Sequence, residues 1–360
     1  MKRVVILCVW LFSVVAGHAQ LSLDECRRLA RENYPEIRQY DLVHQTEQYN
    51  LSNAARAWIP QLAFSAQATW QTDAPNFPKE LTGMLAQQGL EIPGLRKDQY
   101  KVALELNQTI WDGGKSVADK RIARAEATEQ KTMTDVDLYE LEGRVDDLYF
   151  GILLLDERIA QTNLTLNLLR SNLEKVRALQ RNGVAMQSDA DVLEAELLSV
   201  GQQLIQFESS CDSYRRMLGI FIGQKVGDRK LQRPSAVQPL SGESARPELA
   251  MFAAKIDRLT AQEKMVKSSS MPRLGFFAQG YYGYPGLDYM QGMMNSDWSW
   301  NAMLGVKLSW NFGAYYTQKN NLDKLRTSRQ QVEVQRDVFL FNMNLQAAQE
   351  NGDIARLRKA

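Results

Sequence analysis

The stretch that decides the fold is residues 60–70, PQLAFSAQATW, in which apolar residues alternate with small or polar ones. Residues 272–282, PRLGFFAQGYY, repeat this pattern 212 positions later. The repeat starts further upstream, because PEI at 35–37 returns as PEL at 247–249. A period of two predicts β-strands whose two faces meet different surroundings. An internal repeat of this size predicts two copies of one structural unit.

Two further segments alternate in the same way, at residues 100–110 and 299–310. Their length is the roughly 9–11 residues that a tilted transmembrane strand requires. Aromatic residues stand at the strand ends, where membrane-interface girdles place them: Trp70, Tyr100, Trp111, Tyr282, Trp300 and Trp310. A soluble β-sandwich is the alternative, but two hairpins far apart in the chain suit it poorly. Because closure takes about eight strands, we expect three chains to build a trimeric barrel of about twelve strands.

A helical stretch of unusual length separates the strand pairs. Residues 118–181 contain no proline, and apolar residues recur there in steps of four and three. This seam comprises Leu141, Val145, Leu148, Ile152, Leu155, Ile159, Thr162, Leu166, Leu169, Leu173 and Val176, and it resumes at Leu193, Leu197, Val200, Leu204, Phe207, Cys211, Tyr214, Leu218 and Phe221. A period of 3.5 residues predicts coiled-coil packing. At 1.5 Å per residue the helix would extend about 96 Å, too long for a compact domain of this size.

The helical stretch breaks at Asn182-Gly183, which predicts the tip of a helical hairpin. Gly183 suits a left-handed cap on the first helix, and Ser188 or Asp189 can cap the second. Turn chemistry alone explains most of these residue types. The alternative is that the tip also serves as a docking surface and a gate.

The first nineteen residues read as a secretory signal peptide. Lys2 and Arg3 precede an apolar run over residues 4–16, and Gly17-His18-Ala19 offers a cleavage site between small residues. A membrane anchor would need about 18 or more apolar residues, and the run is shorter. We therefore expect cleavage after Ala19.

Composition argues against several classes of function. The chain has 43 basic and 42 acidic residues, so it lacks the basic excess that nucleic-acid binding proteins show. Cys26 and Cys211 would remain after cleavage, too few for a disulfide framework. We see no phosphate loop, nucleophile elbow or metal-ligand spacing, so we expect no enzyme, cofactor or metal. Met290, Met293 and Met294 could bind a soft metal ion, but methionine is more often a filler.

Several motifs together resemble the TolC-like outer membrane efflux family. The motifs are residues 23–26 (LDEC), 33–37 (NYPEI), 58–62 (WIPQL) and 108–114 (QTIWDGG), with a weaker copy of the last at 308–314 (LSWNFGA). The resemblance implies an α+β membrane protein. Four transmembrane β-strands per chain would contribute to a trimeric 12-stranded β-barrel, and long coiled-coil α-hairpins would form a periplasmic tunnel. It also implies the outer membrane of a Gram-negative bacterium.

The resemblance further implies partners and site residues. The homotrimer would contact outer membrane lipid, dock with a periplasmic adaptor (membrane fusion) protein and couple indirectly to an inner-membrane transporter. The adaptor-docking tip would be Gly183, Val184, Ala185 and Ser188. Candidates for the periplasmic gate would be Arg177, Arg181, Asp189 and Asp191.

These inferences divide the chain into three parts after the signal peptide at 1–19. Residues 20–223 form a first repeat of a helix, a β-hairpin at 62–111 and a helical hairpin at 115–223. Residues 224–245 form a linker. Residues 246–360 form a second repeat of a helix, a β-hairpin at 274–310 and an outgoing helix, without the returning helix that the family resemblance implies.

The first hypothesis for function is a passive exit duct for efflux or type I secretion. The alternative is a non-conducting truncated subunit, or a coiled-coil scaffold that retains the docking tip. Electrical conductance would separate the two, because a scaffold passes no ions.

Overall fold

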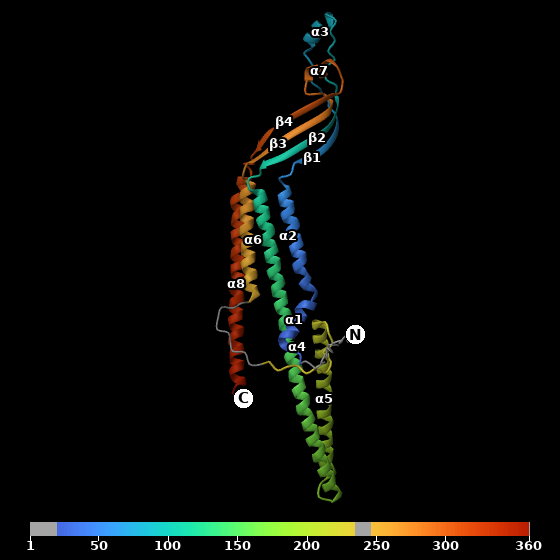
Figure 1. The fold of residues 1–360 in the computed structure, drawn as a ribbon, viewed down its shortest axis with the longest axis vertical. Helices are drawn as coiled ribbons and strands as arrows, with labels where there is room; N and C mark the ends of the chain where they lie inside the picture. The colour runs from blue at the N-terminus through green and yellow to red at the C-terminus, as the bar shows by residue number, and fades with distance from the viewer. Residues whose placement is uncertain (1–19, 235–245, 360) are drawn as a thin grey trace, which may run out of the picture. The chain divides into compact units, whose positions relative to one another are not determined.

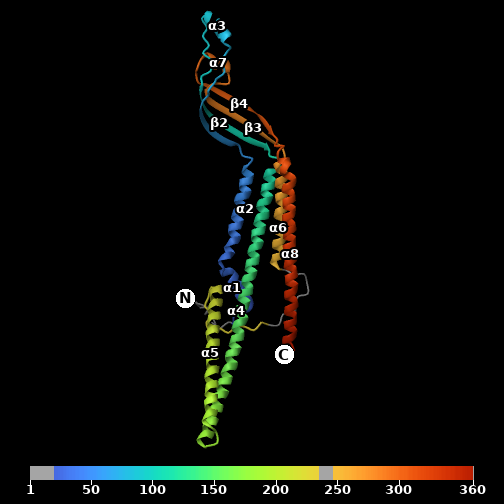
Figure 2. The same cartoon turned by 180° about the vertical axis from the view of Figure 1, so that it is seen from behind.

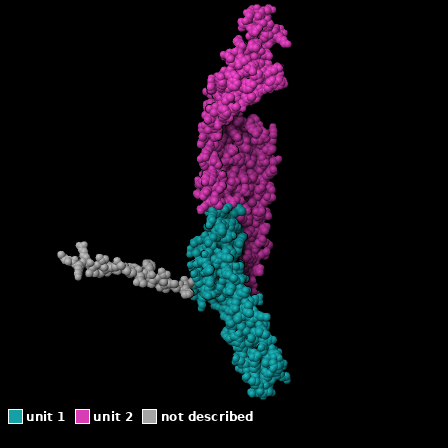
Figure 3. All heavy atoms as spheres, turned by 90° about the vertical axis from the view of Figure 1, so that its right-hand side faces the viewer, with its two compact units in different colours: residues 1–40, 133–248 teal, residues 41–132, 249–360 magenta. Residues whose placement is uncertain are grey.

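The computed structural model of the chain describes residues 20–234 and 246–359 (Figure 1). The expected signal peptide and residues 235–245 of the expected linker lie outside the described residues. The chain divides into two compact units (Figure 3): unit 1 takes residues 1–40 and 133–248, and unit 2 takes residues 41–132 and 249–360. The units do not follow the sequence repeats, because the first repeat contributes to both.

Unit 2 contains a four-stranded antiparallel sheet (Figures 1 and 2). Its strands are β1 (Gln61–Trp70), β2 (Asp98–Trp111), β3 (Arg273–Tyr284) and β4 (Ser299–Ser309), in that spatial order. All four strands expected from the alternating pattern are confirmed. β2 pairs with β3, so the two hairpins join into one sheet. The alternating pattern could not predict this strand order. The hairpin loops contain two short helices, α3 (Lys79–Gln87) and α7 (Tyr289–Met294).

The helices of unit 2 pack through aromatic and charged contacts. They are α2 (Gln39–Arg56), α6 (Pro247–Ser269), α8 (Ala314–Leu357) and the first part of the 67-residue helix α4 (Lys115–Arg181). Lys131 of α4 pairs with Glu47 of α2 at 3.2 Å, and Arg258 of α6 pairs with Glu129 of α4. The rings of Phe252 and Phe339 join α6 to α8, with centroids 5.9 Å apart.

Unit 1 is built on the rest of α4 together with α5 (Gln187–Ile222), α1 (Leu23–Asn33) and the 3-10 turn η1 (Pro35–Arg38). Figures 1 and 2 show α5 running beside the end of α4. The predicted seam is confirmed, because its members are buried or half-buried along both helices. The core gathers Leu138, Leu141, Val145, Tyr149 and Ile152 of α4 with Cys211, Leu218 and Ile222 of α5 and with Cys26 and Ala30 of α1.

Candidate functional site

One face of the sheet, called the outer face below, is apolar and exposed. Register pairs Leu62 with Leu106, Leu106 with Ala278 and Ala278 with Leu304, so these side chains share one face. Phe64 is 72 % exposed and Leu304 is 74 % exposed. The charged position on this face is Asp98, at the loop end of β2, where it pairs with Arg96. A sheet face this apolar and this exposed needs an apolar partner, which a lipid bilayer supplies.

Aromatic side chains border this face at both ends. Near the loops, Tyr282 lies 5.0 Å from Trp300 and 5.3 Å from Trp298, ring centroid to centroid. At the opposite end a bulge between Thr109 and Trp111 brings Trp111 to the outer face beside Leu274. From residue 300 to residue 309 the strand rises about 31 Å. At the tilt of 35–45° that is usual for membrane barrels, this rise spans about 22–25 Å, close to the height of their apolar band.

The inner face of the sheet is polar. Lys101 Nζ donates to Gln279 Oε1 at 3.1 Å, and Gln279 Nε2 donates to the Glu105 carboxylate. The Lys101 ammonium also lies 4.5 Å from the ring centre of Tyr281. Closer to the helices, the same face borders a hollow of about 590 Å³ that Glu105, Gln279, Arg273 and Lys307 help to line. One face therefore suits lipid and the other suits water.

The sheet of one chain has two free edges. β1 and β4 are the outermost strands, and each pairs on one side only among the described residues. Unpaired backbone groups cannot remain exposed to lipid, because nothing there satisfies their hydrogen bonds. A sheet with a lipid-facing side therefore requires another strand at each edge.

The two loops beyond the sheet are bonded to each other. The Tyr284 hydroxyl accepts a hydrogen bond from the Arg96 backbone N–H at 2.9 Å and donates one to the Gly292 carbonyl at 3.0 Å. The Gly94 N–H donates to the Met293 carbonyl at 3.1 Å. Met290 and Met294 of the second loop are each about half-exposed.

The tip of the helical hairpin ends α4 in a Schellman motif. Gly183 has φ +72°, its N–H donates to the Gln180 carbonyl, and the Val184 N–H donates to the Leu179 carbonyl at 2.9 Å. The predicted glycine cap is confirmed. The N-cap of α5 is Met186 and not Ser188 or Asp189; Asp189 is at N3, where its carboxylate accepts from the Met186 N–H at 3.0 Å as in a capping box. Val184 is 73 % exposed and Met186 74 % exposed, which makes the tip apolar.

Two of the charged gate candidates at the tip, Arg177 and Asp191, bind neighbours within the same helical hairpin. Arg177 pairs with Glu194 across the hairpin at 2.8 Å. The Asp191 carboxylate accepts from Gln187 Nε2 at 2.7 Å. Among the described residues no hydrogen bond or ion pair joins Arg177, Arg181, Asp189 and Asp191 to one another, so their role as a gate stays a prediction. The sequence analysis did not predict the role of Glu194. A carboxylate near the tip on the second helix could have indicated a partner for an arginine on the first.

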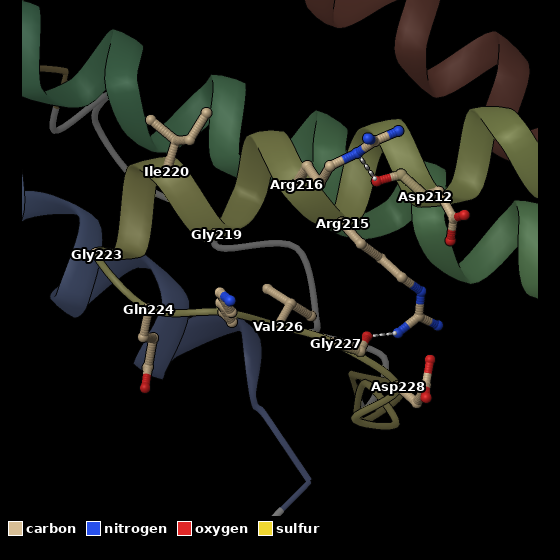
Figure 4. Close-up of a pocket in the computed structure, with 11 residues that line it drawn as sticks. Asp212, Arg215, Arg216, Gly219, Ile220, Gly223, Gln224, Val226, Gly227 and Asp228 are labelled. Carbon is tan, nitrogen blue, oxygen red and sulfur yellow. Dashed lines mark hydrogen bonds between the residues drawn. The ribbon is translucent and has the colours of Figure 1, made fainter.

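A groove lies between the end of α5 and the segment that follows it (Figure 4). Arg215 crosses this groove, where it donates to the carbonyls of Gly227 at 2.9 Å and Arg229 at 3.0 Å. Its other nitrogen pairs with Asp156 at 2.8 Å. Arg215 thereby holds the segment after α5 against the helical hairpin, a structural role that the sequence did not indicate.

Two ionisable groups are sealed in the core of unit 1. Burial, aided by the charge of Glu25, raises the pKa of the Cys26 thiol to about 12. Burial also raises the pKa of the Tyr149 hydroxyl to about 12. This hydroxyl lies 2.7 Å from the Leu21 carbonyl and 2.6 Å from the Gln232 carbonyl, so it ties together the two chain segments that bridge there. Both groups are neutral at physiological pH and serve packing.

Within residues 20–234 and 246–359, no group of three His, Cys, Asp or Glu side chains is arranged to hold a metal ion. No helix in these ranges combines the length and apolar character needed to cross a membrane.

Comparison with known proteins gives a family and a set of similar folds. The family model described as "Outer membrane efflux protein" matches residues 27–223. The outer membrane protein VceC of Vibrio cholerae is similar, with 14 % identity, a TM-score of 0.64, and 89 % of this chain and 75 % of that one covered. No curated protein matches the sequence.

Two solved channels extend the comparison. The CmeC outer membrane channel of Campylobacter jejuni has 15 % identity and a TM-score of 0.59, with 89 % of this chain and 68 % of that one covered. The open state of the MtrE outer membrane channel of Neisseria gonorrhoeae has 15 % identity and a TM-score of 0.55, with 87 % and 68 % covered. At such low identity the likeness shows the fold alone.

Proposed function

Because the chain belongs to the outer membrane efflux protein family, we propose that three copies of it form the outer membrane exit duct of a tripartite efflux or type I secretion system. The family confirms the resemblance seen in the motifs and makes the chain an outer membrane channel protein with a helical periplasmic part. The duct is passive: solutes diffuse through water, and the energy comes from a partner pump.

One observation carries this proposal, namely the sheet with an exposed apolar face, a polar face and two free edges. Three copies related by a threefold axis place β4 of one copy beside β1 of the next. Twelve strands then close, every edge is paired, and the apolar faces turn to lipid. The inner faces, with Lys101, Glu105 and Gln279, line a water-filled lumen.

The hairpin tip is the proposed contact with a periplasmic adaptor. Gly183, Val184, Ala185 and Ser188 lie at or beside the turn, and all but Ala185 are exposed. Val184 provides the apolar surface, to which Met186 adds a second exposed side chain. Replacing Val184 with Glu puts a charge on this surface, and we expect export to be lost while the trimer persists. Export at the wild-type level would refute this docking role.

The gate is proposed to act between copies. Arg177 and Asp191 each use one neighbour in their own chain and remain exposed, so they are available to an adjacent hairpin, as are Arg181 and Asp189. Exposed ion pairs contribute about 0.2–1 kcal/mol each. A ring of such pairs can hold the tips closed and can still yield to an adaptor.

The first experiment is the mass of the protein purified from outer membranes in mild detergent, followed by conductance in a planar bilayer. The exit duct requires a trimer that conducts ions. A monomer would refute the barrel, and a trimer without conductance would favour the non-conducting scaffold instead.

A further inference from the structure

We propose that the inner wall of the sheet makes this duct prefer anionic solutes; this inference rests on the proposed function, because it requires the polar face to line the lumen. The inner positions of the four strands carry three basic residues, Lys101, Arg273 and Lys307, and one acidic residue, Glu105. Each chain therefore adds a net charge of about +2 to the wall, and rings of Lys or Arg favour anions in pores.

The inward position of these residues follows from the register. Glu105 faces Gln279, Gln279 faces Met303, and alternation along β3 and β4 brings Arg273 and Lys307 to the same side. Lys307 lies opposite Gly275, and Arg273 lies two residues further along β3, about 7 Å away. The two cations thus form a basic collar, defined as Arg273 and Lys307, at the helical end of the sheet.

The carboxylates near the basic collar are already occupied. Asp112 is 8 % exposed, and its carboxylate accepts from the backbone N–H groups of Gly114 at 2.9 Å and Ser116 at 2.7 Å as well as from the Ser116 hydroxyl. It also sits at the positive N-terminus of α4, which offsets its charge. Asp119 pairs with Lys115 at 2.8 Å. Within the described residues, neither Arg273 nor Lys307 forms an ion pair with a carboxylate.

The two charges higher on the wall compensate each other. Lys101 and Glu105 are bonded to opposite ends of the Gln279 amide, so they act as a bridged pair. Four residues separate them along β2, about 14 Å, and a similar distance separates Glu105 from the level of Lys307. The basic collar is therefore the uncompensated charge that a passing solute meets.

The loops beyond the sheet carry a net negative charge, so the loops and the wall predict opposite ion selectivities. Residues 71–97 and 285–298 contain five acidic and three basic residues. These groups project into bulk solvent, where salt screens them, whereas wall charges act on a lumen bounded by low-dielectric material. A duct governed by its wall prefers anions, and a duct governed by its loops prefers cations.

The test uses the full chain reconstituted in planar bilayers, with the reversal potential measured under a gradient of potassium chloride. We expect a chloride-to-potassium permeability ratio above 1. The double variant R273E/K307E changes the wall from about +2 to about −2 per chain, so we expect its ratio to fall below 1, a change of about threefold or more. The difference should shrink at molar salt, because the Debye length there is about 3 Å.

Three controls separate the possible outcomes. Lys307→Arg keeps the charge and should keep the ratio, and Lys307→Gln should give an intermediate value. Trimer mass and single-channel conductance are measured for every variant. A conducting wild-type trimer that prefers cations, or equal ratios in wild type and R273E/K307E, would overturn anion preference and leave the exit duct intact. No conductance in the wild type would remove the proposed function and this inference with it.

Discussion

Gly113 lies where β2 turns into α4, and its replacement offers a quantitative test of how tightly sheet and helices are joined. Gly113 has φ +70°, and an added Cβ would lie 2.6 Å from the Met271 Cβ and 3.2 Å from the Pro272 carbonyl oxygen. Gly114 has φ +86°, with nothing within 4 Å of an added Cβ. Both glycines adopt the left-handed conformation, but only Gly113 is closely approached by another segment.

The magnitudes of the two substitutions follow from this difference. A left-handed non-glycine residue costs about 1–2 kcal/mol, and both alanine variants bear this term. Gly113→Ala also overpacks against a Cβ and a backbone oxygen, neither of which can swing away, which costs about 1–3 kcal/mol more. We therefore expect Gly113→Ala to destabilise by about 2–5 kcal/mol and Gly114→Ala by about 1–2 kcal/mol.

The assay is the apparent midpoint of thermal unfolding in detergent, followed by near-ultraviolet circular dichroism. A fixed scan rate is needed because unfolding of a membrane oligomer is often irreversible. Gly113→Ala should melt at least about 2 °C below Gly114→Ala, since 1 kcal/mol shifts the midpoint by about 2–4 °C in chains of moderate size. Equal midpoints would refute the reasoning, because the close approach of residues 271–272 would then have no energetic consequence.

Three further predictions test the core and the tip. Tyr149→Phe should lower the free energy of unfolding by about 1–3 kcal/mol, since a buried carbonyl loses its donor; a loss below about 0.5 kcal/mol would contradict the role of this hydroxyl. Folding raises the pKa of Cys26 from 9.0 to about 12 and that of Tyr149 from 10.0 to about 12. The stabilisation that these two groups contribute should therefore be fully present below about pH 9 and be lost as the pH rises toward 12. Thermal midpoints against pH measure this loss, and Tyr149→Phe should make it smaller. Asp189→Ala should speed hydrogen exchange of the tip amides by about three- to tenfold, whereas Ser188→Ala should not, since the Asp189 carboxylate accepts from the Met186 N–H at the start of α5; equal exchange in both variants would argue against this role.

The sequence predicted the elements because each has a strong period of its own. The alternation in residues 60–70 and 272–282 reflects two environments across a sheet, and the 3.5-residue seam from Leu141 onward reflects a continuous apolar contact between helices. Gly183 was predictable for a similar reason, since a left-handed cap favours a residue without a Cβ. These features are local, so the local sequence is enough to determine them.

The sequence by itself therefore determined the strands, the long hairpin with its turn, and the family. Only the tertiary structure decided which strands are neighbours and which side chains meet across them. The pairing of β2 with β3 brings Gln279 between Lys101 and Glu105, and the folding of the hairpin brings Glu194 to Arg177. The physical reason is that such contacts join residues from separate elements. Periodicity tells which face a side chain occupies and carries no information about the register between elements.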